Sequence, residues 1–81
     1  IRDGDIVVVD RALTPCNGNF VVACVDGEFT LKEYQLDTKN QCVWLIPHNP
    51  NYSKIKVTED NDLIIWGVVT YCVHKCSRLN R

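Results

Sequence analysis

Short runs of β-branched and aromatic residues recur along the 81-residue chain, and turn residues separate them. The runs follow one another at intervals of about 8–12 residues, a spacing typical of all-β domains. Apolar positions show almost no helical period. The pattern predicts a small, strongly twisted all-β domain of about six strands, at residues 5–10, 19–25, 28–36, 41–47, 54–59 and 63–73.

The second and third predicted strands flank Asp26-Gly27, a pair that tolerates the positive φ angles of a type I′ turn. A two-residue loop fixes the register, so Val25 faces Glu28 and Val21 faces Lys32. One face of this hairpin then collects an apolar stripe, which we expect to be the core: Phe20, Val22, Cys24, Phe29 and Leu31. The other face collects Val21, Ala23, Val25, Glu28, Thr30, Lys32 and Tyr34.

Lys32 is the unusual residue of the hairpin. Val21 lies directly across from it and Ala23 on the diagonal, and neither can pair with an ammonium group. If this face is covered, desolvation disfavours the charged amine, and a neutral amine can act as a general base. If the face is open to water, Lys32 is a solvated strand lysine, and the hairpin alone favours this second interpretation.

The last predicted strand, residues 63–73, is apolar on both faces, and Gly67 marks a bulge or bend in it. Regular alternation divides the strand into two sets: Leu63, Ile65, Gly67, Val69 and Tyr71 on one face, and Ile64, Trp66, Val68 and Thr70 on the other. A strand covered on both sides indicates a central position or a subunit contact. We expect a homodimer through this strand, with a role in the core alone as the alternative.

The net charge of −1, from 9 basic and 10 acidic residues, argues against direct nucleic-acid binding. Basic residues cluster only in the tail, 74–81, which we interpret as a solvated terminus. No apolar run approaches the roughly 20 residues needed to cross a bilayer, and no signal peptide is visible. We therefore expect a cytoplasmic protein without a membrane segment. Because the chain starts at Ile1, we expect a fragment or a processed product.

The chain has five cysteines: Cys16, Cys24, Cys42, Cys72 and Cys76. An odd number at irregular spacing fits reduced thiols better than a disulfide framework. Cys72, His74 and Cys76 alternate, so they would share one face of a strand and could ligate zinc. Structural zinc sites require four ligands, so we favour plain cysteines and predict neither a metal site nor a cofactor.

Three segments, "IRDGDIVVVDRALTP", "GNFVVACVDGEFTLK" and "WLIPHNPNYSKIKV…LIIWGVVTY", occur in the order and spacing of a known family. They resemble the LexA/UmuD family of self-cleaving Ser–Lys peptidases, through about residue 74, and the UmuD type most closely. The resemblance implies a LexA/signal-peptidase-like β-fold. Residues 1–81 would then be one C-terminal peptidase-family domain, truncated before the nucleophile serine.

The resemblance also implies a role for Lys32 in "EFTLK", which falls on the general-base lysine of the catalytic dyad. The family serine lies a few residues before the segment matching "IRDGD". We do not expect Ser53, Ser77 or Thr30 to replace it, so the 81 residues by themselves should be inactive. Glu33 departs from the family pattern, in which a basic residue commonly follows the lysine.

In the family, the RecA–single-stranded DNA filament stimulates self-cleavage, and the processed homodimer joins a Y-family translesion DNA polymerase. The resemblance therefore implies an SOS-response function of this kind. The alternative is the C-terminal dimerisation and self-cleavage domain of a LexA-like or phage-type transcriptional repressor. A third possibility is a non-catalytic β-domain that serves only as an interaction module.

Overall fold

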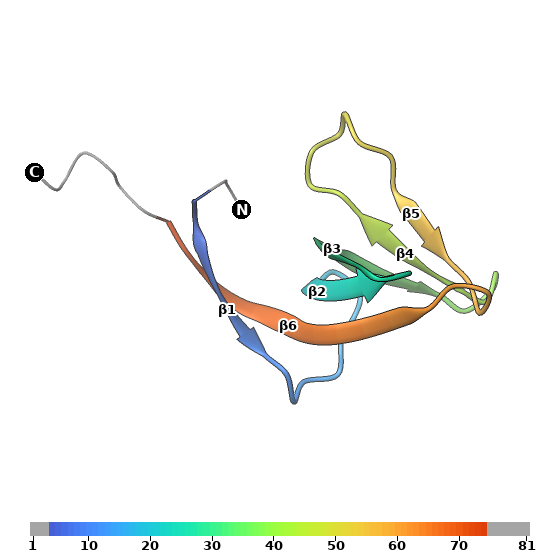
Figure 1. Cartoon of the computed structure of the whole chain (residues 1–81), viewed down its shortest axis with the longest axis horizontal. Helices are drawn as coiled ribbons and strands as arrows, with labels where there is room; N and C mark the ends of the chain where they lie inside the picture. Colours follow the sequence, from blue (N-terminus) through green and yellow to red (C-terminus); the bar gives the residue numbers. More distant parts are fainter. Residues whose placement is uncertain (1–3, 75–81) are drawn as a thin grey trace, which may run out of the picture.

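The computed structural model describes residues 4–74, which form six β-strands and no helix (Figure 1). The strands are β1 (Ile6–Asp10), β2 (Phe20–Val25), β3 (Glu28–Asp37), β4 (Cys42–Ile46), β5 (Ile55–Val57) and β6 (Leu63–Val73). Each lies within one or two residues of its predicted limits. The all-β prediction is therefore confirmed. Within residues 4–74 the fold contains no helix that could span a membrane.

All six strands belong to one antiparallel sheet with the order β1-β6-β2-β3-β4-β5. The last strand, β6, lies between β1 and β2, which are both from the first third of the chain. Its first half, Leu63–Val68, pairs with β2, and its second half, Val68–Val73, pairs with β1. The β1–β6 pair consequently extends beyond the end of β2 as a two-stranded ribbon.

The β2–β3 hairpin has the predicted turn and register. Asp26 and Gly27 have φ angles of 49° and 89°, both positive as a type I′ turn requires. Val21 pairs with Lys32, as the two-residue loop predicts. The turn also holds the β5–β6 loop, because the Asp26 carboxylate accepts hydrogen bonds from the Asp62 backbone N–H and the Asn61 amide, both at 2.9 Å.

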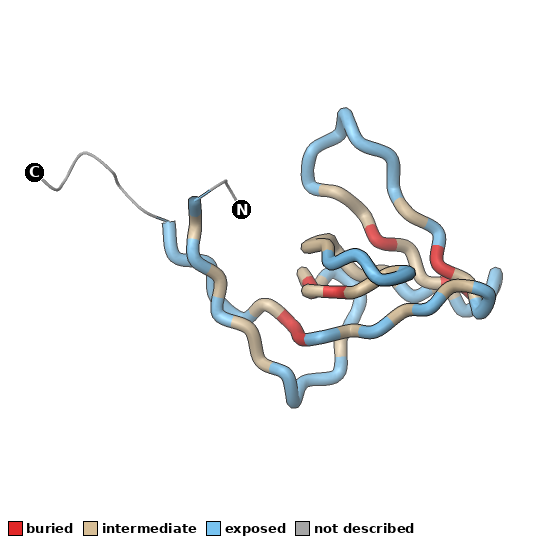
Figure 2. The backbone as a smooth tube through the Cα atoms, viewed as in Figure 1, coloured by how far each residue is buried: buried red, intermediate tan, exposed pale blue. Residues whose placement is uncertain are grey.

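The core occupies the face of the hairpin that we expected to lie outside. Val21 and Ala23 are fully buried, whereas Phe29 is 67% exposed. The buried cluster comes from β2, β4, β5 and β6 and consists of Val21, Ala23, Leu45, Val57 and Val68. Since β5 and β6 are well separated in the strand order, the sheet must curl to bring them into one core (Figure 2). Small and medium side chains, mostly valine, fill the inside of the curled sheet, and the ring of Tyr34 packs against them.

A bulge in β6 also changes which residues face the core. The β2–β6 register shifts between Val22 and Ala23, opposite the segment that contains Gly67. The predicted bulge at Gly67 is therefore confirmed, but the regular alternation predicted along β6 is wrong. Past the bulge Val68 joins the same core as Leu63 and Ile65 instead of facing away from them.

Gly67 also lets β1 pass close to β6. A Cβ atom at this position would collide with the Val9 side chain and would lie 3.2 Å from the Asp10 carbonyl oxygen. Any larger residue here would force the Val9 side chain or β1 itself to move.

Candidate catalytic lysine

Lys32 lies near the middle of β3, on the face of the sheet that carries the core. The row of paired residues across the sheet runs from Lys32 to Val21 on β2 and on to Val68 on β6. Val21 is 0% exposed and Val68 is 3% exposed, while Lys32 itself is half-buried. The face that carries Lys32 is thus buried at its cross-strand neighbours Val21 and Val68, while Lys32 itself keeps part of its surface in water.

The ammonium group of Lys32 has no counter-charge in the described part of the chain. Its Nζ donates a hydrogen bond to the Leu31 carbonyl at 3.4 Å, and no carboxylate of residues 4–74 pairs with it. The adjacent Glu33 points to the other face of β3, where its Oε2 accepts a hydrogen bond from Gln35 at 2.9 Å. Within residues 4–74, the Leu31 carbonyl is therefore the hydrogen-bond partner of the Lys32 ammonium group.

The backbone holds Lys32 firmly on one side only. On the β2 side the ladder continues past Lys32 to Glu33, which pairs with Phe20. On the β4 side the ladder begins at Glu33, which pairs with Ile46, and Pro47 follows with no N–H to donate. At Lys32, therefore, β3 is still paired with β2 but is not paired with β4.

The structure brings no nucleophile of the described chain to Lys32. Ser53 lies in the exposed β4–β5 loop, and Ser77 lies outside the described residues. Thr30 shares the Lys32 face but is paired with Ala23, two residues further along the strand, a separation of about 6–7 Å. That none of the three replaces the family serine stays a prediction.

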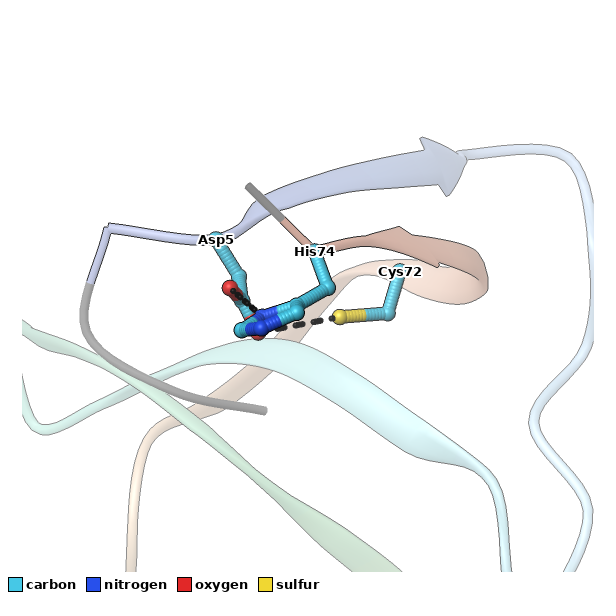
Figure 3. Close-up of polar contacts among 3 residues, drawn as sticks. All are labelled: Asp5, Cys72 and His74. Atoms are coloured by element: carbon cyan, nitrogen blue, oxygen red, sulfur yellow. Dashed lines mark hydrogen bonds and ion pairs between the residues drawn. The ribbon is translucent and has the colours of Figure 1, made fainter. Parts of the chain in front are cut away.

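Of the three residues Cys72, His74 and Cys76, the first two contact the same side chain (Figure 3). That side chain is Asp5, which the sequence analysis did not identify. Asp5 accepts from Cys72 Sγ at 3.6 Å and lies 2.9 Å from His74 Nδ1, whereas Cys76 is outside the described residues. No group of three or more acidic, histidine or cysteine side chains within residues 4–74 is arranged to hold a metal ion. Only the β1–β6 register could have identified Asp5, because it places the ends of the described chain side by side.

Comparison with known proteins supports the interpretation of the sequence motifs. The profile of a family described as Peptidase S24-like matches residues 1–70. Protein MucA of Salmonella typhimurium is 44% identical over 72 residues, covering 88% of this chain and 47% of the relative. Protein SamA of Salmonella typhimurium strain LT2 is 43% identical over 75 residues, covering 93% of this chain and 49% of the relative.

LexA repressors are relatives as well. The LexA repressor of Acidithiobacillus ferrooxidans is 49% identical over 72 residues, covering 85% of this chain and 34% of the repressor. The chain thus spans about half the length of MucA and SamA, and about a third of this repressor. Because the family profile covers most of the chain, the resemblance to self-cleaving Ser–Lys peptidases is confirmed at the level of the family. The chain belongs to the Peptidase S24-like family.

Proposed function

We propose that these residues form the lysine-bearing part of a UmuD-like SOS-response protein that cleaves itself in its full-length form. The observation that carries the proposal is the setting of Lys32: a half-buried amine beside Val21, on the core face, with no carboxylate partner among residues 4–74. The match to a peptidase family supports the same conclusion.

In the proposed mechanism, Lys32 Nζ takes the proton from a serine hydroxyl that precedes the "IRDGD" segment in the full-length protein. The serine oxygen then attacks the carbonyl carbon of the scissile peptide bond, and the protonated lysine returns its proton to the leaving amine. Val21 and Val68, the buried residues in the same cross-strand row, give the base an apolar neighbourhood on the core face. The Leu31 carbonyl orients the ammonium group between the two proton transfers.

The test is self-cleavage of the full-length protein in the presence of the RecA filament, with Lys32→Ala. Loss of a general base lowers the rate by about 10²–10⁴-fold, so we expect cleavage to fall by at least about 100-fold. Lys39→Ala is the matched control, because Lys39 is exposed in the β3–β4 turn. Cleavage of the Lys32→Ala protein at the control rate would exclude the proposed base.

We also propose that the protein forms a homodimer through the β1–β6 ribbon. Pairing of Ile6 with Val73 and of Val8 with Tyr71 puts four apolar side chains on one face. Their exposed fractions are 63%, 51%, 47% and 71%, in that order. Beyond Val68, moreover, β6 has no β2 partner on its second side, which leaves strand edge for another copy. A second copy of the chain would cover both features.

The wider partners are proposed from the family resemblance. They are the RecA filament for the full-length form and a Y-family translesion polymerase for the processed dimer, in the cytoplasm. The processed protein should therefore co-purify with such a polymerase. A variant with a charged residue substituted into the β1–β6 ribbon should not. Recovery of the polymerase with a strictly monomeric variant would contradict a role for the dimer.

The second candidate is the C-terminal domain of a repressor, and the matches to LexA repressors favour it. The two functions differ in what precedes these residues in the gene. A helix-turn-helix domain would establish the repressor, and a short arm of a few tens of residues would establish the UmuD-like protein. In either case the role proposed for Lys32 is the same.

A further inference from the structure

Apolar side chains form a patch on the face of β2, β3 and β6 that points away from the core. Cys24 and Ile64 each lie between two residues that pack in the core, so their own side chains point to the opposite face. Cys24 pairs with Phe29 on one side and with Ile64 on the other, which makes one row across three strands. In the next row Leu31 pairs with Val22, and the β6 bulge adds a residue opposite Val22. We call this surface the outer patch: Val22, Cys24, Phe29, Leu31, Ile64 and Trp66.

Three side chains of the outer patch are open to water. Phe29 is 67% exposed, Ile64 is 56% exposed and Trp66 is 39% exposed. Because strands lie about 4.8 Å apart, Phe29 and Ile64 are about 10 Å from each other, with Cys24 between them. The two rows contain no charged residue. The surface is therefore one continuous apolar area, of the kind that another protein segment covers.

One cationic side chain borders the outer patch. The Arg11 guanidinium lies 4.5 Å from the centre of the Trp66 ring, and Arg11 Nε donates a hydrogen bond to the Trp66 carbonyl at 3.3 Å. No carboxylate of residues 4–74 forms an ion pair with Arg11. Its remaining N–H groups can therefore bind a carboxylate from outside. A segment that matches this surface carries apolar side chains for the patch and an acidic residue for Arg11.

The full-length protein has enough additional chain to supply such a segment. The match to MucA spans 72 residues and 47% of that relative, so more of MucA lies outside the match than inside it. Asp5 and His74 lie beside each other near the limits of the described chain. His74 is ten residues along from Ile64, about 33 Å in an extended strand, and about ten residues of extended chain span this distance. The six strands form a single sheet, and a sheet with a second apolar face normally packs against a second layer.

We propose that a segment of the full-length protein outside residues 1–81 packs across the outer patch, with apolar side chains over Phe29 and Ile64 and a carboxylate bound to Arg11. This segment forms a second layer on the β2, β3 and β6 part of the sheet. The inference rests on the proposed function only because it takes these residues as part of a longer protein. It applies equally to a UmuD-like protein and to a repressor, and it does not involve Lys32, which lies on the core face.

The experiment places the photo-cross-linking amino acid p-benzoylphenylalanine at position 29 of the full-length protein, where it replaces another aromatic ring. Illumination without RecA should give a cross-link within one chain, and mass spectrometry should find its other end outside residues 1–81. The same amino acid at position 52 should not give this cross-link. Position 52 is the matched control because Tyr52 is 69% exposed but lies in the β4–β5 loop. The readout needs no self-cleavage, so failure of the proposed peptidase function would leave it unchanged.

A charge reversal tests the contact with Arg11. Arg11→Glu should lower the yield of the position-29 cross-link by at least about three-fold, because two carboxylates would then meet. Lys39→Glu makes the same change at an exposed residue of the β3–β4 turn and should leave the yield unchanged. Equal yields in the two proteins would overturn the proposed carboxylate contact.

Two other results would overturn the covering segment itself. A cross-link from position 29 that joins two chains would show that a second copy occupies the outer patch. A yield from position 29 no higher than that from position 52 would show that the patch is open to water. If the protein substituted at position 29 does not fold, the cross-linker at position 64 decides in the same way, because Ile64 lies in the same row and is also exposed.

Discussion

Among single residues, Lys32 differs from the other described lysines in its surroundings. Lys54 and Lys56 are exposed, and their ammonium groups lie 4.4 and 6.0 Å from the centre of the Trp44 ring. A cation over an indole ring is stabilised in its charged form. Lys32 instead has the buried Val21 beside it. Of these three lysines, Lys32 alone lies on the core face of the sheet and away from an aromatic ring.

Asp26 is a residue whose role can be tested through pH. The Asp62 backbone N–H, and then the Asn61 side chain, hold the pKa of the Asp26 carboxyl below its ordinary 3.8. A lowered pKa in the folded state stabilises the fold above the ordinary pKa, and this contribution disappears as the pH falls through the lowered value. An asparagine in place of Asp26 would preserve the turn, since Asn-Gly also suits a type I′ loop.

We therefore expect Asp26→Asn to reduce the acid sensitivity of the chain. The urea midpoint of the unsubstituted protein should fall more steeply between about pH 5 and about pH 2.5 than that of Asp26→Asn. Part of the slope will remain, because hydrogen bonds from Asn40 and Trp44 also lower the pKa of Asp37. Parallel curves for the two proteins over this whole range would show that Asp26 contributes nothing to acid stability.

At the scale of elements, the sequence predicted the hairpin but not its orientation. A two-residue Asp-Gly loop determines turn and register locally, so the pairing of Val21 with Lys32 could be derived. Both faces of β2 are apolar, however, with Val21 and Ala23 on one and Val22 and Cys24 on the other. Contacts with distant strands decide which face is buried, and a single hairpin carries no information about them.

The Asp5–His74 contact could not be predicted from the sequence, for a related reason. The two residues are 69 positions apart and meet only because β6 returns to lie between β1 and β2. Cys72 and His74 could be assigned to one strand face from their spacing, but their partner could not be identified. Family resemblance, by contrast, pointed to Lys32 without any knowledge of the sheet, because its motif is local.

The close packing of β1 against β6 at Gly67 gives a prediction for these elements. Gly67→Ala should lower the free energy of unfolding by about 1–3 kcal/mol, since the new methyl group collides with Val9. Val9→Ala should recover part of this loss in the double variant, because it removes the atom that the methyl group meets. Urea denaturation of the two single variants and the double variant measures the coupling, and strictly additive losses would contradict the close approach.

At the scale of the whole molecule, the ribbon exposes apolar side chains on one face, where we propose that a second copy binds. Tyr71→Glu should weaken self-association by at least about ten-fold, because a glutamate in an interface must be desolvated without a partner. Tyr52→Glu is a matched control, since Tyr52 is 69% exposed and Tyr71 is 71% exposed, but Tyr52 lies in the β4–β5 loop. Sedimentation equilibrium compares the three proteins, and equal association of Tyr71→Glu and Tyr52→Glu would place the interface elsewhere.

The role of Lys32 as general base of self-cleavage, as proposed above, can be tested by the pH profile of the cleavage rate of the full-length protein. An amine acts as a base only after it loses its proton, so the rate without RecA should rise with pH toward the alkaline range. Lys32→Ala should remain at background across the whole profile, with Lys39→Ala following the unsubstituted protein. Cleavage by Lys32→Ala with the unsubstituted protein's rate and pH dependence would contradict the claim.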